Sequence, residues 1–186
     1  GYKILIIDAD PQFNATQAML DCYISDENYY TKEIFQEKKT IYRLFIPQID
    51  MSDYYNTPKG EDIIVPLKDN LDILCGDLNL VLANQTNDNR FVKRIRNFIE
   101  DNNLKEKYDY ILIDSAPVGL VSDTFCLNRI ADSTIYVCRA NYTEKDNIKY
   151  LNQLVNNNRL KKVSLVINGT NAKQGYGYGY GHQGKK

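Results

Sequence analysis

The sequence predicts an α/β fold in which a parallel sheet is covered by helices on both faces, and three observations support this. Residues 2–8 and 108–114 are continuous apolar runs, and each run ends in an aspartate. Residues 133–139 and 162–168 are two further strand candidates. Segments with helical spacing separate these strands. Continuous apolar runs are typical of parallel strands buried on both faces, and strands that alternate with helices favour a sheet covered on both sides.

The remaining elements are expected from the spacing of apolar residues and the positions of proline and glycine. The chain turns at Pro11 and Asn14 and then suits the start of a helix. Residues 54–62, with Pro58 and Gly60, are typical of a surface loop. In chain order we expect helices at 15–20, 40–46, 91–103, 123–130 and 144–157, and short strands at 63–65 and 71–74.

Two of the expected helices have a distinct apolar face. The helix over 91–103 also carries basic residues on its outer side. These indicate a solvated helix face, and the alternative is a contact with nucleic acid. The residues expected to face the core are Phe91, Val92, Ile95, Phe98 and Ile99 in this helix and Ile148, Leu151, Leu154 and Val155 in the helix over 144–157; the basic residues are Arg90, Lys93, Arg94 and Arg96.

The composition is that of an ordinary globular domain. The chain has 186 residues, of which 43% are hydrophobic and 25% charged, and this is enough to bury a sizeable core. The net charge of -1 provides no long-range attraction to nucleic acid or to an anionic membrane. No apolar run approaches the roughly 20 residues that span a bilayer, and no signal-peptide pattern opens the chain. We therefore expect a cytoplasmic protein.

The domain organisation is expected to be simple. Residues 1–172 are predicted to form one α/β domain. Residues 173–186 alternate glycine with tyrosine, so they cannot bury enough surface to offset the entropy of ordering and should form a mobile tail. The single histidine, His182, lies in this tail, and the four cysteines form no C-x-x-C pair. A histidine or cysteine metal site is therefore not expected.

Three carboxylates are the candidate site. Asp8 and Asp114 each end an apolar strand, and Asp10 follows two residues after Asp8. In open parallel sheets, ligands bind outside the carboxyl ends of the strands. Three carboxylates at one edge repel each other unless a cation offsets them, and Mg²⁺ prefers oxygen ligands. The alternative is that these acids only cap the helices that follow them, since aspartate is a good N-cap residue.

The motifs around these acids resemble a known superfamily. Residues 3–20, with the Asp-Ala-Asp-Pro-Gln sequence, resemble the second nucleotide motif of ParA-type partition ATPases, and the resemblance continues to residue 114. Residues 109–186 instead resemble the C-terminal part of bacterial polysaccharide tyrosine autokinases. Both families have the deviant Walker (ParA/MinD-type) P-loop fold, a Rossmann-like sheet. We therefore expect a mosaic or chimeric chain whose junction lies near residues 109–118.

This resemblance implies roles for individual residues. Asp8 and Asp10 correspond to the acids that handle Mg²⁺ and the attacking group, which makes Asp10 the catalytic candidate. Asp114 corresponds to the Walker B aspartate, which orders the metal. Asn168 falls where these folds often contact the nucleotide base. The implied cofactors are ATP and Mg²⁺.

One expected part of this fold is missing from the sequence. Both families carry a first strand and a phosphate-binding Walker A loop before the strand that ends in Asp8, and no G-x-x-x-x-G-K-[ST] occurs in the 186 residues. That loop supplies the backbone amides and the lysine that neutralise the β and γ phosphates. We therefore expect this chain, by itself, to be inactive or nearly so.

The resemblance implies two functions from different classes. The first is the ATP-binding domain of a tyrosine autokinase that controls polysaccharide assembly, in which Tyr176, Tyr178 and Tyr180 accept phosphate. Its implied partners are further ATPase subunits, through self-association, and a membrane-anchored polysaccharide export protein at the inner face of the membrane. The second is a ParA-type partition ATPase that binds DNA. A non-catalytic scaffold is a third interpretation.

Overall fold

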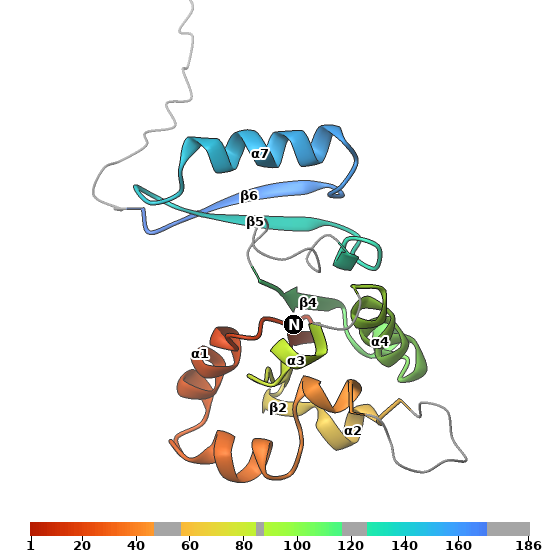
Figure 1. Ribbon diagram of the computed structural model, residues 1–186. Helices are drawn as coiled ribbons and strands as arrows, with labels where there is room; N and C mark the ends of the chain where they lie inside the picture. The colour runs from red at the N-terminus through yellow and green to blue at the C-terminus, as the bar shows by residue number, and fades with distance from the viewer. Residues whose placement is uncertain (47–56, 85–87, 117–125, 171–186) are drawn as a thin grey trace, which may run out of the picture. The chain divides into compact units, whose positions relative to one another are not determined.

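The computed structural model divides into two compact units, the first within residues 1–130 and the second within residues 131–186 (Figure 1). The residues that the structure describes are 1–46, 57–84, 88–116 and 126–170. The predicted tail over 173–186 lies outside them. The single domain expected over 1–172, with its junction near 109–118, stays a prediction.

The first unit contains a four-stranded sheet with the order β2-β3-β1-β4. Strand β1 (Ile4–Asp8) is central and pairs in parallel with both β3 (Leu71–Leu74) and β4 (Tyr110–Asp114). Strand β2 (Val65–Lys68) joins the edge and pairs antiparallel with β3. The predicted α/β fold with a mainly parallel sheet is confirmed, with one antiparallel edge strand. Ile63, which we expected in a strand, instead ends a short helix.

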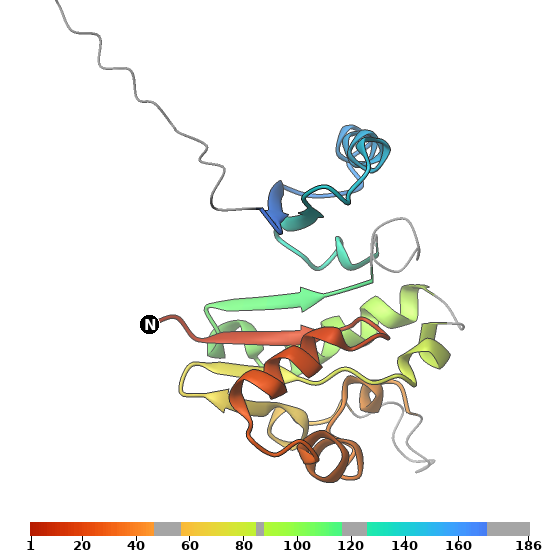
Figure 2. The ribbon, with the colours of Figure 1, turned by 90° about the vertical axis from the view of Figure 1, so that its left-hand side faces the viewer.

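Helices cover both faces of this sheet, and Figure 2 shows α1 toward the viewer and α4 behind the sheet. Side chains alternate between the faces along β1. Leu5 and Ile7 therefore pack in the larger core with α4, whereas Ile6 packs with Met19 of α1 and with Ile34. The helical elements are α1 (Asn14–Tyr23), the π-helix η1 (Tyr30–Phe35), the 3-10 helix η2 (Ile41–Leu44), α2 (Gly60–Ile63), α3 (Leu80–Asn84), α4 (Asp88–Asp101) and α5 (Leu104–Lys107).

Helix α4 has the inward face that its spacing predicted. Phe98 and Ile95 are fully buried. Burial of such a side chain contributes roughly 1.5–3 kcal/mol, so this face is a main source of stability for the first unit. All five apolar residues expected to face the core are buried: Phe91, Val92, Ile95, Phe98 and Ile99.

Strand β4 differs from the sequence-based expectation. Its continuous apolar run predicted burial on both faces, and Ile111 and Ile113 do pack against the larger core. On the opposite face, however, Tyr110 is 51% and Leu112 46% exposed. The physical reason is its position, because β4 is the edge strand of the described sheet and α1 packs on the side of β2 and β3.

The second unit is a β-α-β arrangement. Strands β5 (Thr134–Arg139) and β6 (Val163–Asn168) pair in parallel, and α7 (Lys145–Asn156) connects them. Leu151 and Leu154 are buried as expected. Val155 is 39% exposed, so its expected inward position is wrong. A sheet of only two strands is too narrow to cover the full apolar face of the helix.

Two further expectations concern the connections. The short helix expected at 40–46 is η2, and the loop expected over 54–62 contains α2 from Gly60. The helix expected over 123–130 lies partly outside the described residues. Across the described ranges, no helix is both long and apolar enough to cross a membrane.

Candidate functional site

The parallel sheet places Asp8 and Asp114 side by side. They are register partners at the carboxyl ends of β1 and β4, and the Ala9 amide donates to the Asp114 carbonyl at 2.8 Å. Register partners on neighbouring strands share a face of the sheet. The turn after β1 adds Asp10, whose carbonyl accepts the Phe13 amide at 2.9 Å. The three acids that the sequence singled out therefore lie at one edge of the sheet.

Asp8 is fully buried and strongly hydrogen-bonded. Its Oδ2 accepts the backbone amide and the hydroxyl of Thr16, each at 2.7 Å. Within the described residues, its Oδ1 accepts the Asp10 amide alone, at 3.3 Å, which is longer than an ordinary N–H···O bond. Burial raises the pKa of Asp8, and the bonds from Thr16 oppose that rise.

This pattern makes Asp8 the cap of helix α1. The Thr16 amide belongs to the first turn of the helix, where amides have no partner within the helix. The residue at the N-cap position, Phe13, forms no side-chain cap and has a left-handed backbone with φ of 41°. The carboxylate of the preceding strand takes over this role and also complements the positive end of the helix dipole. Oδ2 of Asp8 therefore acts as the cap of α1, whereas Oδ1 takes no part in capping.

Gly76, which follows β3, packs closely against Asp8, Phe13 and Thr16. The Gly76 amide donates to the Thr16 hydroxyl at 2.7 Å. A Cβ at position 76 would lie 2.5 Å from Cβ of Phe13 and 3.0 Å from Oδ2 of Asp8. Only glycine fits here without a shift of the neighbouring atoms. Thr16 and Gly76 were not among the site residues predicted from the sequence; the signal for Gly76 was its place two residues after the end of β3.

Asp10 and Asp114 are the more accessible acids. Asp10 is partly buried, and its Oδ1 accepts the Gln12 amide at 2.9 Å. Burial raises the pKa of Asp114, and the neighbouring charges of Asp8 and Asp10 raise it further. The acids therefore repel each other at this edge, which a cation would relieve.

The donor set fits a cation of one kind. Among residues 1–46, 57–84, 88–116 and 126–170, no group of three or more His, Cys, Asp or Glu side chains is arranged to hold a metal by itself. Mg²⁺, however, usually keeps several waters and uses one or two carboxylates together with phosphate oxygens. One or two of the carboxylates of Asp8, Asp10 and Asp114, with Asp8 contributing Oδ1, would suit a site of that type. Their roles as metal ligands, and the catalytic role of Asp10, stay predictions.

The other predicted site residues lie elsewhere. Asn168 ends β6 in the second unit and is exposed, and its Oδ1 accepts the Gly169 amide at 2.7 Å. Its contact with a nucleotide base stays a prediction. The expected phospho-acceptors Tyr176, Tyr178 and Tyr180 lie outside the described residues.

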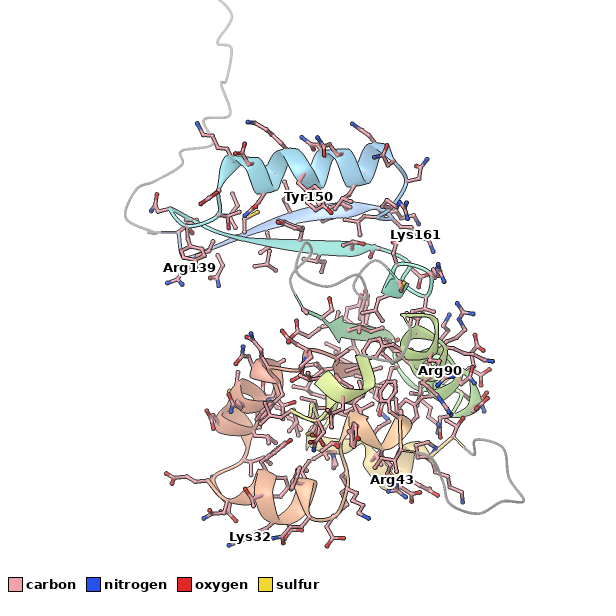
Figure 3. All side chains as sticks on the ribbon, in the orientation of Figure 1. Lys32, Arg43, Arg90, Arg139, Tyr150 and Lys161 are labelled. Atoms are coloured by element: carbon pink, nitrogen blue, oxygen red, sulfur yellow. The ribbon has the colours of Figure 1, made fainter. Side chains whose placement is uncertain are left out.

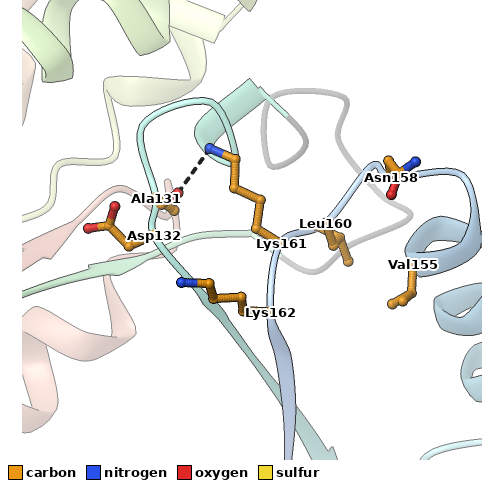
Figure 4. A pocket seen from close by; sticks show the side chains of 7 residues that line it. All are labelled: Ala131, Asp132, Val155, Asn158, Leu160, Lys161 and Lys162. Carbon is orange, nitrogen blue, oxygen red and sulfur yellow. Dashed lines mark hydrogen bonds between the residues drawn. The ribbon is translucent and has the colours of Figure 1, made fainter.

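The second unit also has a surface pocket of about 530 Å³ (Figure 4). The Lys161 ammonium group donates to the Ala131 carbonyl at 3.2 Å across this pocket. None of the site residues predicted from the sequence lines it. The lining residues are Ala131, Asp132, Val155, Asn158, Leu160, Lys161 and Lys162.

A comparison with known families decides the classification. A family profile described as an AAA domain matches residues 1–167. The chain belongs to this AAA domain family. An uncharacterized protein of Methanocaldococcus jannaschii is 27% identical over 180 residues, which cover 90% of this chain and 62% of that relative. The AAA domain chain thus spans less than two thirds of that protein.

Solved structures with a similar fold include a partition protein and a kinase domain. A putative plasmid partition protein of Borrelia burgdorferi, bound to AMPPNP, has a TM-score of 0.65 and 18% identity, and the match covers 94% of this chain and 68% of that one. The kinase domain of the Escherichia coli tyrosine kinase ETK has a TM-score of 0.53 and 18% identity over 97% of this chain and 62% of that one. These structures share the fold expected from the sequence, and the family itself is shown by the AAA domain profile.

Proposed function

We propose that this AAA domain binds a Mg²⁺–nucleotide, ATP being the expected one, at the carboxyl edge of β1 and β4. The observation that carries the proposal is the pairing of Asp8 and Asp114 at the ends of adjacent strands, with Asp10 in the turn that follows β1; burial, and then the charges of Asp8 and Asp10, raise the pKa of Asp114. The similar partition protein bound to AMPPNP supports the choice of ligand. When bound, a Mg²⁺–nucleotide supplies an activated phosphoryl group.

The residues of this chain have separate tasks in the proposal. Asp8 and Asp114 hold the cation, directly or through its waters, and Asp10 orients the attacking group. Asn168 contacts the base. The 186 residues contain no G-x-x-x-x-G-K-[ST] loop, and the proposal gives none of them the task of neutralising the phosphates.

The cation part of the proposal is tested with Mn²⁺, whose binding to the full chain is measured by electron paramagnetic resonance. We expect the wild type to bind Mn²⁺ and Asp114→Asn to bind it more weakly, because a charged ligand is lost. Asp21→Asn is the matched control, since Asp21 is exposed on α1. Addition of AMPPNP should tighten the binding. A wild-type chain that binds no Mn²⁺, with or without AMPPNP, contradicts the proposal.

We propose further that the nucleotide serves tyrosine phosphorylation in the control of polysaccharide assembly. The support is the tail, in which Tyr176, Tyr178 and Tyr180 alternate with glycine and can enter the site of a neighbouring subunit without steric hindrance. A cytoplasmic location and a membrane-anchored export partner belong to the same proposal.

Phosphotyrosine mapping by mass spectrometry tests this function after incubation with ATP and Mg²⁺. Because this chain by itself is expected to be inactive or nearly so, phosphate is expected on the three tail tyrosines when a partner subunit that carries a P-loop is present. Tyr2 and Tyr142 are highly exposed on the folded part and serve as internal controls that should stay unmodified. An unmodified tail, even with a partner subunit that carries a P-loop, speaks against the kinase function.

A partition ATPase is the second candidate, and the outer face of α4 favours it. Arg90 and Lys93 are exposed on this helix, and Figure 3 labels Arg90 near its start. If this face contacts DNA, plasmid DNA retains the chain in a salt-sensitive way, because phosphate contacts release counterions. The double variant Arg90→Ala/Lys93→Ala should then lose retention, whereas Lys145→Ala/Lys149→Ala on α7 should not. Equal retention of all variants indicates a solvated helix face.

A further inference from the structure

The hydroxyl of Thr16 lies between two groups that come from different strands. It donates to Oδ2 of Asp8, which ends β1, and accepts the amide of Gly76, which follows β3. Both distances are 2.7 Å, and all three residues are buried. A side chain from α1 thus links the ends of two neighbouring parallel strands.

The direction of these hydrogen bonds follows from chemistry. A backbone amide can only donate, so the Gly76 amide uses a lone pair of the Thr16 oxygen. The single hydroxyl hydrogen of Thr16 therefore points at Oδ2 of Asp8, which accepts it. Together with the Thr16 amide, this gives Oδ2 two short bonds, whereas Oδ1 has one contact of 3.3 Å among the residues that the structure describes. The two oxygens of one carboxylate are therefore unequal.

Packing holds the carboxylate in this orientation. A Cβ at position 76 would lie only 3.0 Å from Cγ and Oδ2 of Asp8, so the Gly76 backbone is in close contact with this group. Rotation of the carboxylate would break both bonds from Thr16 in a fully buried place. An unsatisfied buried donor is costly, so the observed rotamer is the one that the surroundings stabilise.

We propose that Thr16 is a positioning residue that reserves Oδ2 of Asp8 for the protein and leaves Oδ1 as its single oxygen for the cation. This inference rests on the proposed cation site. It means that Asp8 binds the cation through one oxygen, and that the orientation of this oxygen depends on the Thr16 hydroxyl. Groups that orient a metal ligand in this way typically affect metal affinity by 10–100-fold.

The test measures Mn²⁺ affinity of the full chain by electron paramagnetic resonance. Thr16→Val keeps the shape but removes the hydroxyl, and we expect affinity to fall about 10-fold or more. Thr16→Ser keeps the hydroxyl and should remain within about twofold of the wild type. Thr40→Val is the matched control, because Thr40 is also buried and also donates to a carboxylate, Asp77 Oδ2, at 2.7 Å. Its Mn²⁺ affinity should not change.

Equal affinity of Thr16→Val and the wild type overturns the positioning role while the proposed cation site stands. A wild type without Mn²⁺ affinity removes both. Equal losses in Thr16→Val and Thr40→Val also overturn the inference, because they indicate a general effect of a lost buried bond.

A second measurement uses only the wild type, in case Thr16→Val does not fold. Amide hydrogen exchange is followed by NMR as Mg²⁺ is added. Since Oδ2 keeps its bonds in the proposal, the amides of Thr16 and Gly76 should remain protected when the cation binds. Loss of their protection at saturating Mg²⁺ contradicts the proposal.

Discussion

At the scale of residues, Asp8 and Asp114 end neighbouring strands, but their carboxylates differ in burial and in the hydrogen bonds that they accept. Asp8 is 0% exposed and uses the Thr16 amide and hydroxyl, whereas Asp114 is exposed and accepts a backbone hydrogen bond from Ser115. Full burial raises the pKa of Asp8, and partial burial of the carboxyl group raises the pKa of Asp114, although the residue as a whole is exposed. The pair therefore combines a fixed acid with an accessible one.

The pKa of Asp114 leads to a prediction about pH. Because its folded-state pKa lies above 3.8, the ordinary value, the folded state binds the proton more tightly than the unfolded state. The contribution of Asp114 to stability is therefore largest below pH 3.8 and is lost as the pH rises through the raised pKa. We expect the free energy of unfolding of Asp114→Asn, measured in urea without divalent cations, to increase relative to that of the wild type as the pH rises through the raised pKa of Asp114. Asp21→Asn should show no such trend, and a pH-independent effect of Asp114→Asn contradicts the prediction.

Gly76 gives the second prediction at this scale. An alanine Cβ would lie 2.5 Å from Cβ of Phe13, so the neighbouring backbone has to shift. Overpacking of this kind costs about 1–3 kcal/mol. We expect Gly76→Ala to lower the free energy of unfolding by this amount in urea denaturation. Gly60→Ala is the control with a smaller effect, because its Cβ would meet the flexible end of Ile64 at 3.2 Å.

At the scale of elements, Asn102 joins the end of α4 to the start of α2. Its side-chain amide donates to the carbonyls of Phe98 and Pro58, and its Oδ1 accepts the Gly60 amide at 2.6 Å. Helix α2 has only four residues and its N-cap position, Lys59, forms no side-chain cap. Asn102 therefore supplies the cap from another helix.

Removal of this side chain should be costly. Asn102→Ala leaves the Gly60 amide and the Pro58 carbonyl without this partner, and an unsatisfied buried group costs about 1–3 kcal/mol. Since these groups are partly buried, we expect a loss near the lower end in urea denaturation. Asn152→Ala, on the exposed side of α7, should change stability by less than about 0.5 kcal/mol. Equal effects of the two substitutions would show that Asn102 is not a cap.

At the scale of the whole molecule, the two units differ in how much apolar surface they bury. The first unit has a sheet packed on both faces, whereas β5 and β6 form a pair on which Ile135 is 59% and Val137 61% exposed. A two-stranded sheet is marginally stable without further packing.

Hydrogen exchange with mass spectrometry tests this difference. Amides of β5 and β6 should exchange faster than those of β1, because their opening exposes little additional apolar surface. Comparison within one chain provides the control. Equal protection of β1 and β5 would show that both units open together.

Local sequence patterns predicted most helices and strands, because the formation of these elements depends largely on residues that are close together along the chain. The spacing of Phe91, Ile95 and Phe98 identified the inward face of α4 without any knowledge of its partner. The exposure of Leu112 and Val155 could not be predicted in this way, because it depends on whether a neighbouring strand or helix exists beside them.

The sequence by itself determined the fold class and the position of acids at strand ends, since periodicity and short motifs are local properties. Only the tertiary structure decided which oxygen of Asp8 accepts the hydrogen bonds from Thr16. Thr16 and Gly76 are 8 and 60 residues from their hydrogen-bond partners in the chain. Thr16 and Gly76 meet their partners because the parallel strands β1 and β3 end on the same side of the sheet and α1 packs back against the sheet. Such long-range contacts leave no periodic signal in the sequence.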